Sequence, residues 1–201
     1  MTAIKICGLT RHEDAEAAAV FGADALGFVL WPGSPRHTSA EAAGAMARDL
    51  PLFITTVGVF VNPSADDVLR AADAGLRVAQ IHGLVPAGRL ALPVLRAVRL
   101  SAATANGIEP AVDDATVLLD AHDPVRHGGT GQTVDWTRAR AIAATRRVVL
   151  AGGLTAQNVG DAIRMVEPYA VDVASGVETE PGIKDPLKLR AFIDAVKGTG
   201  T

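Results

Sequence analysis

The chain has 201 residues, enough for one domain with a sizeable hydrophobic core. Its 22 acidic and 19 basic side chains nearly balance and form no basic block, which argues against nucleic acid as a partner. No apolar run approaches the ~18 residues that span a bilayer, no leader pattern precedes the first apolar run, and the single cysteine can form no internal disulfide. We therefore expect a cytoplasmic protein that has no membrane partner.

Short apolar, β-branched runs recur along the whole chain. They cover residues 3–8, 25–30, 53–61, 78–83, 94–100, 116–121, 147–153 and 170–176. Most are apolar at consecutive positions rather than alternating, which is typical of strands covered on both faces in a parallel sheet.

Helical patterns lie between these predicted strands, at residues 11–23, 39–50, 64–75, 135–144 and 155–166. Several begin at a residue that caps helices well, namely Ser39, Ser64, Asp135 and Thr155. Gly22 and Gly75 stand where the first and third of these helices should end.

This alternation is compatible with an eight-fold (β/α) barrel or with a doubly wound open sheet. Eight strands, and no nucleotide-binding loop after the first of them, favour the barrel. The connections at residues 84–93 and 101–115 are too short for full helices, so we expect one or two shortened helices. The sequence thus predicts a single (β/α)8 barrel that forms one domain over residues 1–201.

In such barrels the active site lies at the C-terminal ends of the strands. Cys7 ends the first predicted strand, where a buried apolar role and a role as catalytic base are both open. A base would need the pKa of the thiol to be lowered, for which Lys5 or Arg36 could supply the positive charge.

Asp120 ends the sixth predicted strand and could either cap the loop that follows or act as a general acid. Arg36 follows a rigid Pro-Gly turn that could present its guanidinium to a carboxylate, although an exposed loop arginine fits the segment equally well.

Small residues end the last two predicted strands, at Gly152, Gly153, Ser175 and Gly176. The backbone N–H groups of such loops can cradle a phosphate, and the loops after strands seven and eight are the usual phosphate site in barrels. We therefore expect a barrel of the phosphate-binding type that takes a small phosphorylated substrate. We also expect a glycine-rich lid at residues 127–133 and His82 in the pocket wall. No metal site is expected, because no set of side chains has the spacing of metal ligands.

Together, "KICG", "GTG", "AGGL" and "SGVE" resemble the phosphoribosylanthranilate isomerase family of tryptophan biosynthesis, in the family's own order and over nearly the whole chain. The resemblance implies a (β/α)8 barrel that needs no cofactor and performs an Amadori rearrangement. It implies that Cys7 is the general base, that Asp120 is the general acid and that Arg36 holds the anthranilate carboxylate. Gly152, Gly153, Ser175 and Gly176 would bind the phosphate.

Three motif positions depart from the family, at Trp31, Arg96 and Gln132. Two alternatives stay open: a related barrel such as the histidine-pathway aminoaldose isomerase, and a non-catalytic barrel that binds phosphorylated metabolites. The sister isomerase typically has an aspartate where this chain has Cys7. A monomer is expected, because no feature of the sequence marks an apolar patch for a dimer.

Overall fold

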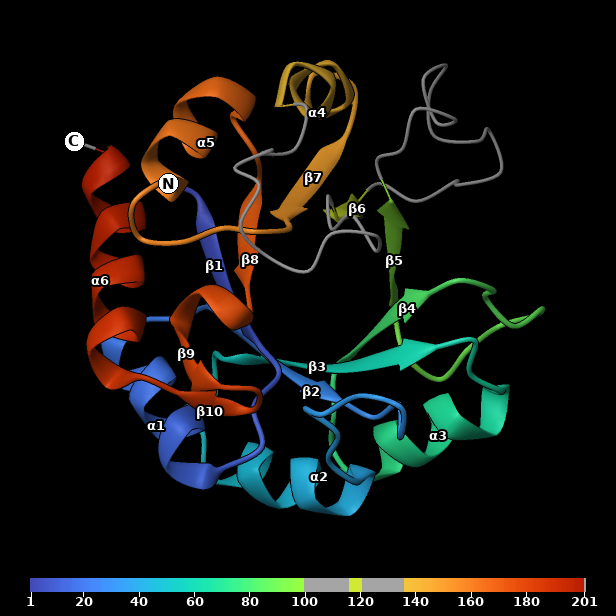
Figure 1. The fold of residues 1–201 in the computed structure, drawn as a ribbon. Coiled ribbons are helices and arrows are strands. Elements are labelled where there is room, and N and C mark those ends of the chain that lie inside the picture. The colour runs from blue at the N-terminus through green and yellow to red at the C-terminus, as the bar shows by residue number, and fades with distance from the viewer. Residues whose placement is uncertain (100–115, 121–135, 201) are drawn as a thin grey trace.

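The computed structural model describes residues 1–99, 116–120 and 136–200. Eight parallel strands form a closed barrel in which each strand pairs with the next and the last pairs with the first (Figure 1). They are β1 (Ala3–Cys7), β2 (Ala25–Val29), β3 (Thr55–Val61), β4 (Val78–His82), β5 (Val94–Arg99), β6 (Thr116–Asp120), β7 (Arg147–Ala151) and β8 (Ala170–Val173).

The helices surround the barrel on its outside (Figure 1). They are α1 (His12–Phe21), α2 (Ala40–Arg48), α3 (Ala65–Asp73), α4 (Trp136–Ala143), α5 (Val159–Val166) and α6 (Pro186–Lys197). A short 3-10 turn, η2 (Ser175–Val177), and a small antiparallel hairpin of β9 (Glu178–Glu180) and β10 (Ile183–Lys184) connect β8 to α6, and a second 3-10 turn, η3 (Gly198–Gly200), follows α6.

The predicted barrel is confirmed, and so is a shortened fourth connection, because residues 83–93 contain no helix. The fifth connection, residues 101–115, lies outside the described residues, as does the predicted cap Asp135. Ser39 and Ser64 cap α2 and α3 as expected, the latter with a full capping box. The prediction that Thr155 begins a helix is wrong: its N–H donates to Oδ1 of Asn158, and α5 begins only after that turn.

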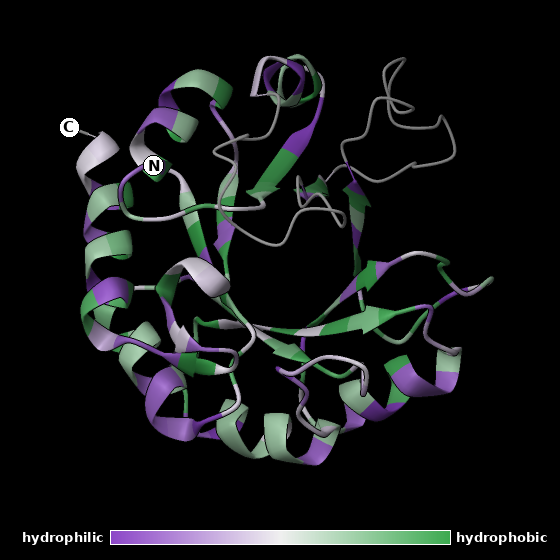
Figure 2. Cartoon of the chain, viewed as in Figure 1, coloured by the Kyte–Doolittle hydropathy of each residue, from purple (hydrophilic) through white to green (hydrophobic). Residues whose placement is uncertain are grey.

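Two apolar layers hold the barrel and its helices together. The larger core packs the outward faces of the strands against the helices, and Figure 2 shows the strands largely in the hydrophobic colour. Inside the barrel, Leu118 and Val149 lie in one buried cluster and Cys7, Val57 and Val59 in another. Because successive strand residues alternate between the two faces, every second residue of each strand points into the barrel.

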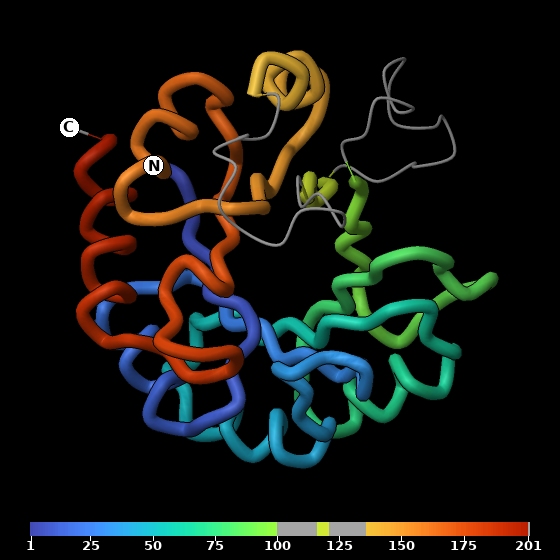
Figure 3. Tube along the Cα trace, in the orientation of Figure 1, coloured from blue at the N-terminus to red at the C-terminus, as the bar shows by residue number. Residues whose placement is uncertain are grey.

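The first and last strands of the barrel meet where it closes. Ala3, Ile4, Lys5 and Ile6 of β1 pair in register with residues 170–173 of β8, and Figure 3 shows the blue trace of β1 beside the orange trace of β8. This closure brings the loop after β8 next to the end of β1.

The close approach of α2 to the end of α3 requires a glycine. A Cβ built on Gly44 would lie 2.2 Å from the backbone oxygen of Ala74, whereas one built on Gly160 of α5 would meet only the flexible ends of Arg164 and Thr199. We expect Gly44→Ala to lower the free energy of unfolding by about 1–3 kcal/mol through overpacking. Gly160→Ala should raise it by up to about 1 kcal/mol, because alanine favours helices.

Urea unfolding of the two variants beside the wild type measures both changes. Equal shifts, or a more stable Gly44→Ala protein, would contradict this account of the helix contact.

Candidate active site

The candidate acid and base lie at the ends of two strands that are not neighbours in the barrel. Cys7 is the last residue of β1 and belongs to an interior cluster. Asp120 is the last residue of β6, two positions after the interior residue Leu118, so it lies on the same inward face. Strands β7 and β8 separate β6 from β1, which places the two residues on different sides of the barrel mouth.

Cys7 is buried beside a buried ion pair. The ammonium of Lys5, two residues earlier on the same face of β1, donates to Oδ1 of Asp172 at 2.9 Å. A Cβ built on Gly27 of the neighbouring strand would lie 2.9 Å from both Cys7 Sγ and Lys5 Nζ. Glycine at this position therefore leaves the room in which thiol and ammonium lie together.

Burial raises the pKa of the Cys7 thiol above its ordinary value, and the charge of Lys5 opposes this increase only in part. Lys5 itself stays protonated: burial lowers its pKa, but Asp172 and Cys7 together raise it above the ordinary value. A catalytic base would need the pKa of the thiol to be lowered. In this structure the pKa of Cys7 is raised instead, because the effect of desolvation is larger than that of the neighbouring cation.

Arg36 is held in place by a carboxylate of the hairpin that follows β8. Its Nε donates to Oε1 of Glu178 at 2.9 Å and its Nη2 donates to Oε2 at 2.6 Å. Its aliphatic stem passes over Gly8, where an added Cβ would lie 2.6 Å from Arg36 Cδ. Arg36 is therefore partly buried rather than an exposed loop arginine, and its contacts with Glu178 and Gly8 hold it in place.

The two predicted phosphate loops pack against each other. Gly152 and Gly153 adopt left-handed backbone angles, with φ of 92° and 65°. A Cβ on Gly176 would lie 2.0 Å from the backbone oxygen of Leu154, so the turn at Ser175 and Gly176 lies directly against the loop after β7. Glycine is needed there for the close approach of the two backbones.

His82 lies in the barrel wall, as expected. Its Nε2 is 3.0 Å from Nε2 of Gln80, and burial lowers the pKa of the imidazole. A ring with a lowered pKa is neutral at pH 7 and so adds no positive charge to the mouth.

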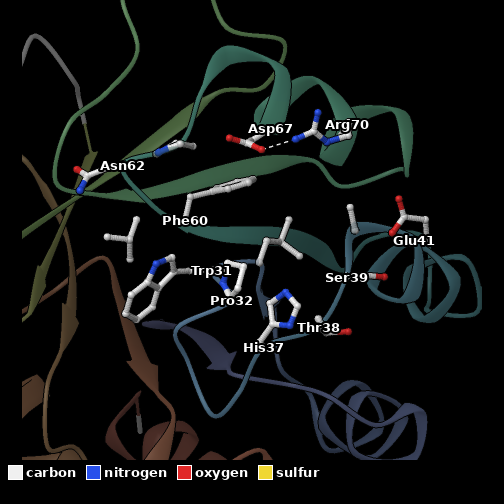
Figure 4. A pocket seen from close by; sticks show the side chains of 14 residues that line it. Trp31, Pro32, His37, Thr38, Ser39, Glu41, Phe60, Asn62, Asp67 and Arg70 are labelled. Atoms are coloured by element: carbon white, nitrogen blue, oxygen red, sulfur yellow. Dashed lines mark hydrogen bonds and ion pairs between the residues drawn. The ribbon is translucent and has the colours of Figure 1, made fainter.

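A separate hollow of about 260 Å³ lies outside the barrel, between the segments that follow β2 and β3. Figure 4 shows Trp31, His37, Phe60 and Asn62 among the side chains around it. Neither Cys7 nor Asp120 lines it, so the candidate site is the barrel mouth and not this hollow.

The sequence missed three charged residues that surround the site: Asp172, Glu178 and Lys184. A signal existed for Asp172, which is charged within the apolar run "AVDV". Glu178 and Lys184 belong to a hairpin that no periodicity indicated, although Glu178 is the last residue of the motif "SGVE". The proposed lid at residues 127–133 lies outside the described residues and stays a prediction.

Two further observations concern metals and membranes. Within residues 1–99, 116–120 and 136–200, no three His, Cys, Asp or Glu side chains are grouped so that they could hold a metal ion. In the same part of the chain, no helix has both the length and the apolar character to cross a bilayer.

A closed parallel barrel with titratable groups at its mouth and paired glycine loops after its last two strands defines an enzyme of the (β/α)8-barrel class. The family model for N-(5'-phosphoribosyl)anthranilate isomerase matches residues 4–195. The chain belongs to this family, which confirms the resemblance seen in its motifs.

Individual relatives agree with the family model. The isomerase of Chromohalobacter salexigens is 47% identical over 98% of this chain and 95% of its own. The crystal structure of the Thermotoga maritima isomerase, 38% identical, superimposes with a TM-score of 0.84 over 98% of this chain and all of its own. A 36% identical structure, with a TM-score of 0.80 over 98% of this chain and 100% of its own, holds reduced 1-(o-carboxyphenylamino)-1-deoxyribulose 5-phosphate.

The contact between Lys5 and Cys7 predicts a shift in the thiol titration. Lys5→Met removes the cation that opposes burial, so the pKa of Cys7 should rise further and the thiolate should form only at higher pH. Because Cys7 is the only cysteine, the ultraviolet absorbance of the thiolate, taken as the difference from the same protein with Cys7→Ser at each pH, follows this one group. Lys197→Met, on the outer helix α6, is the control and should leave the midpoint unchanged; an unchanged midpoint in Lys5→Met would show that the two groups do not interact.

Proposed function

We propose that this protein isomerises N-(5'-phosphoribosyl)anthranilate to 1-(2-carboxyphenylamino)-1-deoxyribulose 5-phosphate in tryptophan biosynthesis, with Cys7 as general base and Asp120 as general acid. The observation that carries the assignment of roles is the placement of a buried thiol and a carboxylate on different sides of one barrel mouth. The family to which the chain belongs supplies the reaction.

The chemistry needs one proton donor and one proton acceptor. Asp120 protonates the ring oxygen of the ribose while the bond from C1 to that oxygen breaks, which opens the sugar and leaves an iminium at C1. The Cys7 thiolate then removes the proton from C2, which the iminium has made acidic. The resulting enolamine gains a proton at C1 and loses its hydroxyl proton at C2, giving the ketone. Proton transfers to and from the substrate accompany every bond change, and no electrons pass to or from another molecule, so acid and base groups are the chemistry that this scheme requires.

Lys5 has a definite place in this scheme. A buried thiol whose pKa is raised is mostly protonated at neutral pH, and only its thiolate is a useful base. The ammonium of Lys5 stabilises that thiolate, and Asp172 keeps the ammonium protonated and in position.

Binding energy at the two ends of the substrate orients the bond between C1 and C2. Arg36 grips the carboxylate of the anthranilate ring, and the loops at Gly152, Gly153, Ser175 and Gly176 receive the phosphate through backbone N–H groups. The packing of Gly176 against Leu154 supports this, because it brings both loops to one place. Because both ends of the substrate are fixed, C1 and C2 are held in the orientation that the proton transfers require.

The remaining features of the proposal concern the protein as a whole. Residues 1–201 form one domain and act as a monomer in the cytoplasm, on a small phosphorylated substrate and without nucleic acid or membrane as a partner. The mild charge balance and the continuous order of strands and helices support this description.

Substitution of the proposed base and acid tests the mechanism. We expect Cys7→Ser and Asp120→Asn each to lower kcat by about 10²-fold or more, the low end for losing a general acid or base. Turnover of freshly prepared phosphoribosylanthranilate, followed by its fluorescence, measures the loss. Asp161→Asn, on the exposed surface of α5, is the matched control and should keep the wild-type rate.

Three outcomes are informative. A near-normal rate in Cys7→Ser or in Asp120→Asn would remove that residue from the mechanism. A wild-type protein that binds the product but never converts the substrate would support the non-catalytic barrel instead. Turnover of the histidine-pathway aminoaldose alone would support the sister isomerase.

A further inference from the structure

Three charged side chains from separate parts of the chain form a cluster beside the barrel mouth. Arg36 follows β2, Glu178 begins β9 and Lys184 ends β10. The Lys184 ammonium donates to Oε1 of Glu178 at 2.8 Å, while Arg36 grips both oxygens of the same carboxylate. The side chains of Glu178 and Lys184 are only 4% and 1% exposed.

Every N–H of the Lys184 ammonium has an acceptor. Besides Glu178, it donates to the backbone oxygen of Cys7 at 2.6 Å and to that of Ala174 at 3.2 Å. A neutral amine has only two hydrogens to donate, so this geometry is that of a protonated lysine. Lys184 therefore ties the carboxylate of Glu178 to the end of β1 and to the residue just after β8.

The same contacts keep Glu178 ionised. Burial alone would raise the pKa of its carboxyl, but the hydrogen bonds from Arg36 and Lys184 outweigh burial and hold the pKa below the ordinary value. A buried carboxylate of this kind is stable only while its partners stay in place.

The guanidinium of Arg36 has two edges that can grip a carboxylate with two hydrogen bonds. Glu178 occupies the edge formed by Nε and Nη2. Among the described residues, the guanidinium of Arg36 makes side-chain hydrogen bonds to Glu178 alone, which leaves the edge formed by Nη1 and Nη2 without a second side-chain partner. The aliphatic stem of Arg36 lies against Gly8. Since the cluster holds two cations and one anion, a second carboxylate at this edge would bring its charge to zero.

We propose that Glu178 is a positioning residue for substrate binding: anchored by Lys184, it fixes one edge of Arg36 so that the other edge receives the carboxylate of the anthranilate ring. This inference rests on the proposed role of Arg36 and extends it to two residues that never touch the substrate. It also explains why an ion cluster is buried beside the mouth at all, where apolar side chains of similar volume would be less costly.

Two ligands that differ by one carboxylate test the proposal. The first is reduced 1-(o-carboxyphenylamino)-1-deoxyribulose 5-phosphate, and the second is the same compound without the ring carboxyl. We expect the wild type to bind the first at least about 10-fold more tightly, which corresponds to about 1.4 kcal/mol. In Glu178→Gln this preference should fall to about 2-fold or less, because Arg36 no longer presents a fixed edge.

A purely structural role for Glu178 would predict a different result, since both ligands would then bind more weakly by the same factor. That outcome, or an undiminished preference in Glu178→Gln, would overturn the inference and leave the role of Arg36 intact. A wild type that binds both ligands equally would instead overturn the proposed grip by Arg36. If Glu178→Gln does not fold, Glu178→Asp keeps the charge but shortens the reach, and its preference should fall in the same direction.

An independent test compares the kinetic effect of Glu178→Gln in the wild type with its effect in a protein that carries Arg36→Met. With phosphoribosylanthranilate as substrate, Glu178→Gln should raise KM by about 10-fold and leave kcat nearly unchanged. In a protein that already carries Arg36→Met, the same change should add little, because Glu178 acts through Arg36. Equal increases in both backgrounds would contradict the proposal, and Glu180→Gln, exposed on the same strand, is the control.

Discussion

The pairing of β1 with β8 is the constraint on which the site depends. Lys5 of β1 lies in register with Asp172 of β8, and the hydrogen bond between their side chains spans 167 positions of the chain. The same closure brings the hairpin after β8 against the backbone of Cys7, which accepts from Lys184. A barrel that did not close between these two strands would have neither the carboxylate that holds Lys5 beside the thiol nor the contacts that hold Glu178 against Arg36.

The charged side chains in and beside the barrel mouth lie next to groups of opposite charge. Asp172 faces Lys5, Lys5 lies beside Cys7, and Glu178 is shared by Lys184 and Arg36. Removing one member of a buried ion pair leaves an uncompensated charge, which costs several kcal/mol. The two ion clusters therefore depend on every member being in place, and the proposed reaction depends in turn on groups held at fixed positions around the sugar.

The thiol shows a balance between packing and chemistry. Burial favours the neutral form of Cys7, whereas proton abstraction needs the thiolate, and Lys5 is the group that reduces the difference. Gly27 makes this possible by leaving space on the neighbouring strand. The catalytic proposal thus depends on a residue with no side chain as much as on the residues that carry the chemistry.

The sequence by itself determined the barrel, since continuous apolar strands alternating with capped helices leave few other folds. It also placed Cys7 and Asp120 at the ends of their strands, because strand order and strand ends can be read from local pattern. It could not determine which residues meet across the closure: Asp172, Glu178 and Lys184 are distant in sequence from the atoms they contact, and no local periodicity encodes those contacts. Only the tertiary structure decided that Arg36 is gripped by Glu178 and that the thiol pKa is raised, because burial and the distances between charges exist only once the barrel has closed.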